Sequence, residues 1–266
     1  MAVPPGKLFG TDGVRGRVGD LLDAELAMAV GRAGTSAVEA DRPKVLIIRD
    51  TRESGPMLES ALAAGVAEAG GQVYLGGVLP TPAALLLSRD HGFDLAAVVS
   101  ASHNPYWDNG IKLFAGAGGK LDDETEARIE RLIHDPPPPS GHSGRIERLT
   151  GAERDYLRSL EAYFRLDLNG TRVMLDCANG STYRVAAEIF GRLGAEVEVF
   201  AAEPDGRNIN LDCGSTHVEN LARRMGGSGA DIGFSFDGDG DRVLAVDREG
   251  NVHDGDEIVA FVATDR

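Results

Sequence analysis

The chain is poor in cysteine and in long apolar runs, and both shortages exclude classes of protein. Its 266 residues include two cysteines. These residues, Cys177 and Cys213, lie in unrelated contexts without a CxxC motif, which argues against a zinc site or a disulfide framework. No apolar run approaches the ~20 residues that a membrane-spanning helix requires, and no signal-peptide pattern opens the chain. A reduced, cytoplasmic setting is therefore expected.

Basic residues are also scarce relative to acidic ones. The chain has 27 Lys and Arg against 42 Asp and Glu, for a formal net charge of -15. Such a surface repels polyanions, so neither nucleic acid nor an anionic membrane surface is expected as a partner. A small anionic ligand in a local basic pocket remains compatible with this charge. The hydrophobic content of 42% is that of a globular protein with one large or two ordinary domains.

Short apolar runs alternate with helical patterns in both halves of the chain. This order predicts an α/β fold, with a mostly parallel sheet and flanking helices in each of two consecutive domains of similar topology, 1–166 and 167–266. The proline run 136–139 is interpreted as stiff chain within the first domain. The expected strands are 44–50, 72–75, 95–99, 145–149, 172–177, 195–200, 230–236 and 243–247, and the expected helices are 23–40, 56–69, 81–87, 122–134, 152–164, 185–193 and 218–225.

A polar stretch with the sequence SASHNPYWDNGIK follows the apolar run 95–99. Open α/β sheets keep their chemistry at the carboxyl ends of parallel strands, where this stretch begins. Pro105 disfavours helix before it, and Asn109-Gly110 is a turn signal, so an irregular loop is expected to hold the hydroxyl of Ser102. A serine in such a loop can carry a transferable group. The alternative is a simple turn, because Ser, Asn and Pro dominate loops generally.

An acidic loop with the sequence DGDGDR follows the expected strand 230–236. Its carboxylates, Asp237, Asp239 and Asp241, would repel one another without a cation. A calcium-binding EF-hand loop needs Gly and Glu where this chain has Arg242 and Arg248, so that site is excluded. Hard oxygen ligands favour Mg²⁺ over zinc. The alternative is a solvated acidic hairpin without a metal.

The segment KLFGTDGVRG near the N-terminus places Arg15 between two glycines. Glycines let a backbone approach a ligand closely, and the forked guanidinium of arginine suits phosphate. The segment matches neither the Rossmann fingerprint nor the P-loop. A surface turn is the alternative interpretation.

Together, SASHNP, NGIK and DGDGDR resemble the N-terminal half of an α-D-phosphohexomutase. The segments KLFGTDGVRG, YWDNGIKLF, LDCANGSTY and NINLDCGSTHVE are similar to the phosphoglucosamine mutase branch of that family. The resemblance runs through nearly the whole chain in the right order. It corresponds to the first two of the four domains that family members have.

The resemblance implies roles for eight residues. Ser102 would be the phosphorylated serine, and its phosphoryl oxygen would join Asp237, Asp239 and Asp241 around one Mg²⁺ ion. The remaining implied residues are Arg15 and Arg242 for phosphate, Lys112 as a base in its neutral form, and His103 as an alternative acid or base. A phosphoryl-transfer site needs such positioned charge more than covalent activation.

The activity implied by the resemblance is isomerisation of glucosamine 6-phosphate and glucosamine 1-phosphate, with a 1,6-bisphosphate as intermediate and activator. A sugar phosphate is the expected partner, and a homodimer is compatible with the resemblance. Without domains that grip the rest of the sugar, the chain is expected to turn over poorly. Two alternatives stay open: a mutase for glucose or mannose phosphate, and a noncatalytic binding or regulatory module.

Overall fold

The computed structural model of the chain describes residues 8, 10, 13–116, 118–138 and 141–264. These residues form two compact units, the first within 1–101 and 107–156, and the second within 102–106 and 157–266. The short segment 102–106 therefore belongs to the second unit, although strands of the first precede and follow it. The division falls inside a helix, and the domain limits 1–166 and 167–266 remain a prediction. No helix among the described residues has the length and hydropathy that a bilayer crossing demands.

The first unit is built on a six-stranded sheet in the order β1-β5-β4-β2-β3-β6. The centre is parallel, since β2 pairs with β3 and β4, and β3 pairs with β6. β5 is antiparallel to β4, and β1 is antiparallel to β5. The strands are β1 (Val14–Arg17), β2 (Lys44–Arg49), β3 (Gln72–Val78), β4 (Leu95–Val99), β5 (Asp108–Ala115) and β6 (Ile146–Arg148), and the helices are α1 (Ala24–Ala37), α2 (Gly55–Glu68), α3 (Thr81–His91), α4 (Asp123–His134) and α5 (Ala152–Tyr163).

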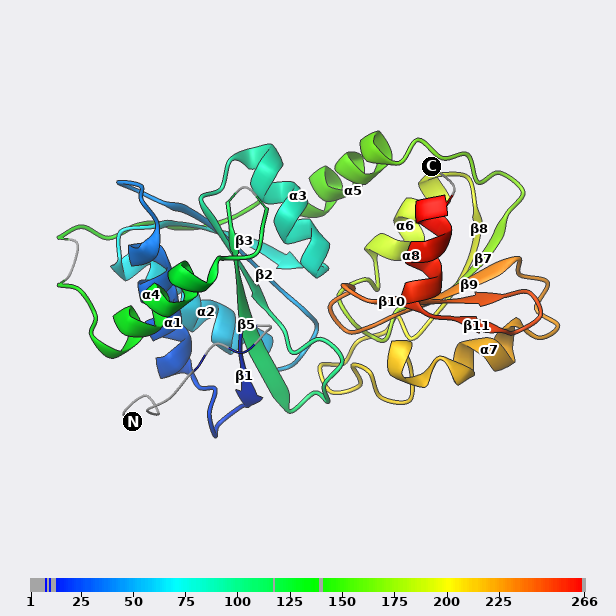
Figure 1. Ribbon diagram of the computed structural model, residues 1–266, viewed down its shortest axis with the longest axis horizontal. Helices are drawn as coiled ribbons and strands as arrows, with labels where there is room; N and C mark the ends of the chain where they lie inside the picture. Colours follow the sequence, from blue (N-terminus) through cyan, green and yellow to red (C-terminus); the bar gives the residue numbers. More distant parts are fainter. Residues whose placement is uncertain (1–7, 9, 11–12, 117, 139–140, 265–266) are drawn as a thin grey trace. The chain divides into compact units, whose positions relative to one another are not determined.

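Helices cover both faces of this sheet (Figure 1). Alternate side chains of β2, Val45 and Ile47, pack into one core with the apolar faces of α1, α2 and α4. α3 contacts β2 and β4 from the other side. All five residues of β4 are buried, as expected for a strand covered on both faces.

Local sequence explains where these helices begin and how closely they pack. The side chains of Asp23 and Asp122 accept hydrogen bonds from backbone N–H groups in the first turns of α1 and α4. α1 and α2 approach closely because Gly31 and Gly65 face the partner helix: an added Cβ would lie 2.3 Å from the carbonyl oxygen of Leu62 and 2.0 Å from that of Met28, respectively. Any side chain at either glycine would separate the two helices.

The second unit contains a five-stranded sheet in the order β11-β10-β9-β7-β8. β7 pairs in parallel with β8 and β9, and β10 is antiparallel to both β9 and β11. Its elements are β7 (Arg172–Asp176), α6 (Val185–Arg192), β8 (Glu196–Phe200), the 3₁₀ turn η1 (Ser215–His217), α7 (Glu219–Met225), β9 (Ile232–Phe236), β10 (Val243–Asp247), β11 (Val252–His253) and α8 (Gly255–Thr264).

The β7 strand separates two small cores in this unit. Val173 and Leu175 pack on the side of α6, whereas Met174 packs with Leu221 and Met225 of α7. The alternation follows from the two-residue period of a strand. An α/β fold with two sheets and flanking helices is confirmed.

The two sheets repeat one topology. The order β5-β4-β2-β3 in the first unit matches β10-β9-β7-β8 in the second. At the carboxyl ends of the central strands β2 and β7, a buried aspartate accepts a hydrogen bond from a buried serine. This serine lies at the end of the adjacent parallel strand or directly after it. Ser100 donates to Asp50 over 2.6 Å, and Ser235 donates to Asp176 over 3.3 Å. The repeat therefore extends from topology to individual side chains.

Two residues beyond each of these serines lie Ser102 and Asp237. The candidate phosphoryl carrier and the first acidic residue of the candidate metal loop thus occupy equivalent positions in the two copies of the topology. Both follow the carboxyl end of a parallel strand, where α/β folds place ligands.

Two expectations about loops are wrong. Asn109-Gly110 is not a turn but part of β5, and Arg15 lies in the paired strand β1 and not in a surface turn. Gly110 is required by close packing between strands, because an added Cβ would lie 2.6 Å from the Ser100 carbonyl oxygen and 2.9 Å from Cγ of Arg15. The glycine signal here marks a close approach within the sheet.

Candidate functional site

The acidic loop joins β9 to β10 and brings three carboxylates together. Asp237, Asp239 and Asp241 each offer an oxygen atom, and these three atoms lie within 4.8 Å of one another. Asp237 and Asp239 are buried, whereas Asp241 is exposed. The loop closes through a hydrogen bond of 3.1 Å from the Gly240 backbone N–H to the Asp237 carbonyl, with Gly240 at a φ of 67°. Glycine adopts this left-handed conformation without steric cost.

Burial and mutual repulsion perturb the most enclosed of these groups. Burial raises the pKa of Asp237 to about 7, with a further contribution from the charge of Asp239. A hydrogen bond from Ser102 lowers the pKa of Asp237 but does not offset burial. A divalent cation would offset the repulsion among the carboxylates, and an all-oxygen donor set suits Mg²⁺. The residues present therefore fit a hard divalent metal ion.

The hydroxyl of Ser102 donates a hydrogen bond to Oδ2 of Asp237. Ser102 is fully buried and has a left-handed backbone, with a φ of 54°. Such a conformation is uncommon for residues other than glycine and, where it occurs, often marks a functional site. Nδ1 of His103 lies 3.4 Å from the Ser102 hydroxyl oxygen. The second unit thus brings the serine, the histidine and the acidic loop together.

The backbone of the acidic loop is held by two neighbouring loops. The N–H of Ser181 donates to the Gly238 carbonyl over 2.8 Å. An added Cβ at Gly180 would lie 2.4 Å from that same carbonyl oxygen, and one at Gly214 would lie 2.8 Å from the Phe236 carbonyl oxygen. These glycines belong to the segments LDCANGSTY and NINLDCGSTHVE. Their structural role is to let three loops pack at the carboxyl edge of the sheet.

Asp176 ties the same loops to the end of β7. Its carboxylate accepts hydrogen bonds from the N–H groups of Ala178 at 3.0 Å and Gly214 at 2.7 Å, besides the hydroxyl of Ser235. Burial raises the pKa of Asp176, and these hydrogen bonds lower it in part. The carboxylate therefore acts as a buried structural acceptor.

Arg242 follows the three aspartates in the loop. Its backbone N–H donates to Oδ1 of Asp237 over 3.1 Å. Its side chain is 54% exposed, and Nε lies 3.9 Å from Oδ1 of Asp241. The guanidinium is therefore accessible beside the acidic loop.

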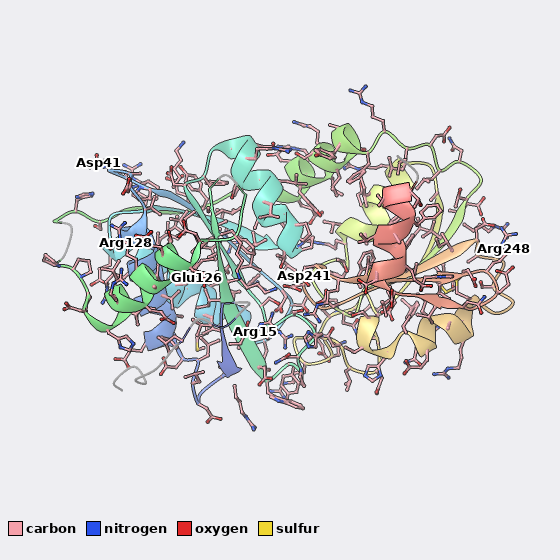
Figure 2. All side chains as sticks on the ribbon, viewed as in Figure 1. Arg15, Asp41, Glu126, Arg128, Asp241 and Arg248 are labelled. Carbon is pink, nitrogen blue, oxygen red and sulfur yellow. The ribbon has the colours of Figure 1, made fainter. Side chains whose placement is uncertain are left out.

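Arg15 and Lys112 lie on paired strands of the first unit. Arg15 of β1 is opposite Gly110 of β5, two residues before Lys112, so both side chains project from the same face of the sheet. Lys112 is buried, with 6% of its surface exposed. Figure 2 labels Arg15 in the first unit and Asp241 in the second. Each unit thus brings together its own subset of the predicted residues.

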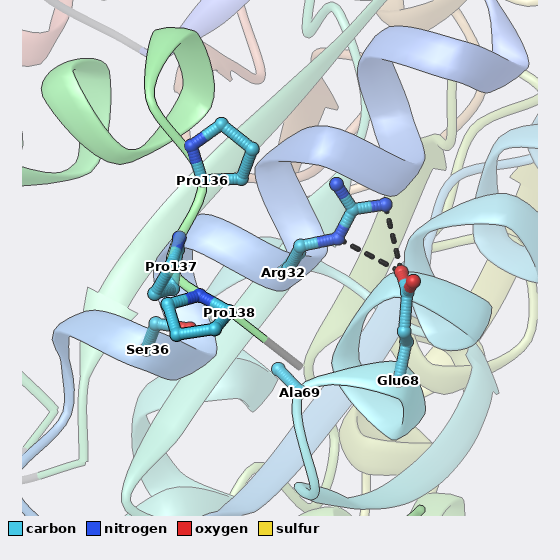
Figure 3. A pocket seen from close by; sticks show the side chains of 7 residues that line it. All are labelled: Arg32, Ser36, Glu68, Ala69, Pro136, Pro137 and Pro138. Carbon is cyan, nitrogen blue, oxygen red and sulfur yellow. Dashed lines mark hydrogen bonds and ion pairs between the residues drawn. The ribbon is translucent and has the colours of Figure 1, made fainter. Parts of the chain in front are cut away.

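A cavity of about 240 Å³ in the first unit contains none of the predicted site residues (Figure 3). It lies between α1, the end of α2 and the prolines after α4. Arg32 and Glu68 form an ion pair of 2.7 Å at its wall. The cavity offers no group with an evident role in phosphoryl transfer.

Comparisons with known proteins account for these features. The family model for phosphoglucomutase/phosphomannomutase, alpha/beta/alpha domain I, matches residues 6–137, and the model for domain II matches residues 154–250. The chain belongs to the phosphoglucomutase/phosphomannomutase family. The α-D-phosphohexomutase resemblance inferred from the motifs is confirmed.

Curated members of this family include close relatives of the chain. A phosphoglucosamine mutase from Moorella thermoacetica is 50% identical over 265 residues, and one from Syntrophus aciditrophicus is 48% identical over 268 residues. Each alignment covers 97% of this chain and 60% of the relative. The chain thus spans about 60% of the length of these curated relatives.

A solved structure from the phosphoglucomutase/phosphomannomutase family has the same fold. This protein, from Burkholderia thailandensis, is 30% identical and superposes with a TM-score of 0.80. The match covers 92% of this chain and 56% of that protein.

Sequence reasoning did not assign roles to several residues that build the site. Asp176, Ser181, Gly214 and Asn210 lie in segments that supported the family resemblance, but no chemistry was attached to them. The available signal was the polar, glycine-containing sequence after β7 and β8. Its function became evident only from the hydrogen bonds that it makes.

Proposed function

We propose that the chain carries the phosphoryl-transfer centre of a phosphoglucosamine mutase, which interconverts glucosamine 6-phosphate and glucosamine 1-phosphate. The observation that supports this most is the hydrogen bond from Ser102 to Asp237 within a cluster of three carboxylates. A serine that only ended a strand would need no such neighbours. The names of the curated relatives supply the sugar class.

Asp237, Asp239 and Asp241 would hold one Mg²⁺ ion, together with a phosphoryl oxygen on Ser102. A bound Mg²⁺ ion would neutralise charge on the transferring phosphoryl group. Two carboxylates of the cluster are buried, so their attraction for a cation is weakly screened by solvent. A phosphoserine would bring about -1.5 to -2 further charges to the same cluster, which strengthens the need for a cation.

The transfer step breaks one ester bond and forms another. The sugar hydroxyl attacks the phosphorus atom on Ser102, the bond from phosphorus to the sugar oxygen forms, and the bond to Oγ of Ser102 breaks. The hydroxyl proton passes to a base, and a proton returns to Oγ of Ser102. The resulting 1,6-bisphosphate reorients, and the reverse step transfers its other phosphoryl group to Ser102. The same bisphosphate would activate an unphosphorylated chain.

His103 and Lys112 are the proposed proton carriers. The 3.4 Å distance from His103 Nδ1 to Oγ of Ser102 supports a role for the imidazole near the seryl oxygen. Lys112 is buried in β5, and in its neutral form its amine would accept the proton of the sugar hydroxyl. We assign phosphate binding to Arg15 and Arg242, whose guanidinium groups suit phosphoryl oxygens.

The test is transfer of phosphate to Ser102 of the 266-residue chain. The chain is incubated with glucosamine 1,6-bisphosphate and Mg²⁺, and phosphorylation is followed by intact mass and mapped by peptide fragmentation. We expect one phosphoryl group on Ser102, lost in Ser102→Ala and slowed strongly by Mg²⁺ chelation. Ser100→Ala is the matched control and should still be phosphorylated.

Competing donors decide the sugar and the class of protein. Glucose and mannose 1,6-bisphosphates are compared with the glucosamine compound under the same conditions. Faster transfer from glucose or mannose would replace the proposed sugar. Absence of transfer from all three would contradict an enzymatic role and favour a binding or regulatory module. Sedimentation of the same sample tests for the homodimer with which the resemblance is compatible.

A further inference from the structure

Asn210 contacts the segment 102–106, the Ser102 turn, at two points. It lies in the polar loop after β8 and is 7% exposed. Its side-chain Nδ2 donates hydrogen bonds to the Ser102 carbonyl at 2.9 Å and to the Asn104 carbonyl at 3.2 Å. Ser102, Asn104 and Asn210 all belong to the second unit. One amide group therefore binds the backbone on both sides of His103.

The backbone of Asn210 is itself fixed. Its N–H donates to the Ala178 carbonyl over 2.9 Å, and its φ is 57°. Asparagine tolerates this left-handed conformation better than most residues other than glycine. The position thus combines a backbone geometry that few residues adopt with a side chain that can donate two hydrogen bonds.

The orientation of the amide is determined by its surroundings. Nδ2 faces two carbonyl oxygens, so a flipped amide would bring Oδ1 against both of them. No described residue donates a hydrogen bond to the buried Oδ1. A buried acceptor without a donor is unfavourable, so the two hydrogen bonds donated by Nδ2 outweigh the cost of leaving Oδ1 without a donor.

Asn210 also touches the acidic loop. An added Cβ at Gly238 would lie 2.8 Å from Nδ2 of Asn210 and 2.6 Å from the Ser102 carbonyl oxygen. The amide, the Ser102 backbone and the residue after Asp237 are therefore packed together.

We propose that Asn210 is a positioning residue that sets the Ser102 hydroxyl against Asp237. The inference rests on the proposed phosphoryl transfer for its functional consequence, but its structural content is independent of it. Asn210 holds the carbonyl of Ser102 and so determines where its Oγ points. Its predicted effect is on the transfer step and not on the affinity for the sugar.

Two substitutions remove the donors in different ways. Asn210→Gly tolerates the left-handed backbone and deletes the amide, whereas Asn210→Asp keeps the shape and replaces the donor with an acceptor. Asn208→Asp is the matched control, because the Asn208 amide donates to the Glu203 carbonyl at 2.9 Å and accepts from the Asp205 N–H at 3.0 Å, within its own loop. All variants are compared below their unfolding midpoints.

The first readout is the kinetics of Ser102 phosphorylation. We expect both Asn210 variants to lower the maximal rate on the order of tenfold to hundredfold, as a small misplacement of a reacting group does. The donor concentration at half-maximal rate should change less than about twofold. Asn208→Asp should retain the wild-type rate. Equal rates in wild type and both Asn210 variants would overturn the proposal.

The second readout does not depend on phosphorylation. Chymotrypsin cleavage after Tyr106 reports local opening of the segment 102–106. Loss of both hydrogen bonds should accelerate cleavage in the Asn210 variants by about tenfold or more, with little change in Asn208→Asp. Unchanged cleavage would overturn the positioning role even if wild-type Ser102 is phosphorylated. If wild-type Ser102 accepts no phosphate, the proposed function fails, and the cleavage rates still decide the role of Asn210.

Discussion

Gly238→Ala perturbs the packing between the Ser102 turn and the acidic loop with a single methyl group. The new Cβ would lie 2.6 Å from the Ser102 carbonyl oxygen, 2.8 Å from Nδ2 of Asn210 and 2.8 Å from Cδ1 of Ile209. These contacts are too short for a Cβ, so the neighbouring groups must move. The backbone of Gly238 is not in the left-handed region, so packing and not strain at position 238 is tested.

The expected loss of stability follows from two opposing effects. Overpacking of a close-packed site costs about 1–3 kcal/mol. Restriction of the unfolded chain by alanine offsets about 0.4–1 kcal/mol of this. The free energy of unfolding should therefore fall by roughly 1–2 kcal/mol. The displaced Ser102 should lose on the order of tenfold to hundredfold in its rate of phosphorylation.

Gly255→Ala is the matched control in the same unit, because no heavy atom lies within 4 Å of an added Cβ there. Urea denaturation gives the free energy of unfolding, and intact mass gives the phosphorylation rate. The reasoning is refuted if Gly238→Ala and Gly255→Ala have the same stability and the same rate. That result would mean that the Ser102 carbonyl does not pack against Gly238.

Three further predictions concern buried groups. Arg52→Met removes one partner of a fully buried ion pair and should lower the free energy of unfolding, measured by urea denaturation, by about 3–5 kcal/mol. Arg32→Met removes one partner of an exposed ion pair and should lower it by about 0–1 kcal/mol. Equal losses in the two variants would contradict this contrast. Burial raises the pKa of Asp176 in the folded state, so ionisation of this group lowers the free energy of unfolding as the pH rises above about 4. In denaturation experiments at increasing pH, the stability advantage of wild type over Asp176→Asn should therefore shrink. An advantage that grows with pH would contradict the assigned direction. Burial raises the pKa values of Cys177 and Cys213 to about 12. Both thiols should therefore react with a disulfide reagent at pH 8 far more slowly in folded than in unfolded protein. Rapid reaction of the folded chain would contradict their burial.

The sequence predicted the repeated α/β topology because its signals are local and strong. Continuous apolar runs such as Leu95–Val99 indicate strands buried on both faces, and glycines and capping residues delimit the helices between them. The edge strand β1 and its neighbour β5 were missed. Their glycines and polar residues look like turns, and only the packing of Gly110 against neighbouring strands shows why glycine is needed there.

The candidate metal ligands could be predicted from the sequence, but the residues that hold them in place could not. Three aspartates at alternate positions would repel one another without a cation and so indicate a metal site, and Ser102 lies in a recognisable motif. Asn210 and Asp176 bind backbone atoms that are distant in sequence, and no spacing rule indicates such contacts. Their roles follow from the tertiary structure alone.

The central claim is that a phosphoryl group on Ser102 and the three aspartates share one divalent ion. Paramagnetic Mn²⁺ tests this directly when it is added to the phosphorylated chain, because it broadens the ³¹P signal of a phosphate that it binds. We expect one equivalent of Mn²⁺ to broaden the phosphoserine signal beyond detection, and Asp239→Asn to weaken that effect. A sharp ³¹P signal while the three aspartates hold Mn²⁺ would contradict the account.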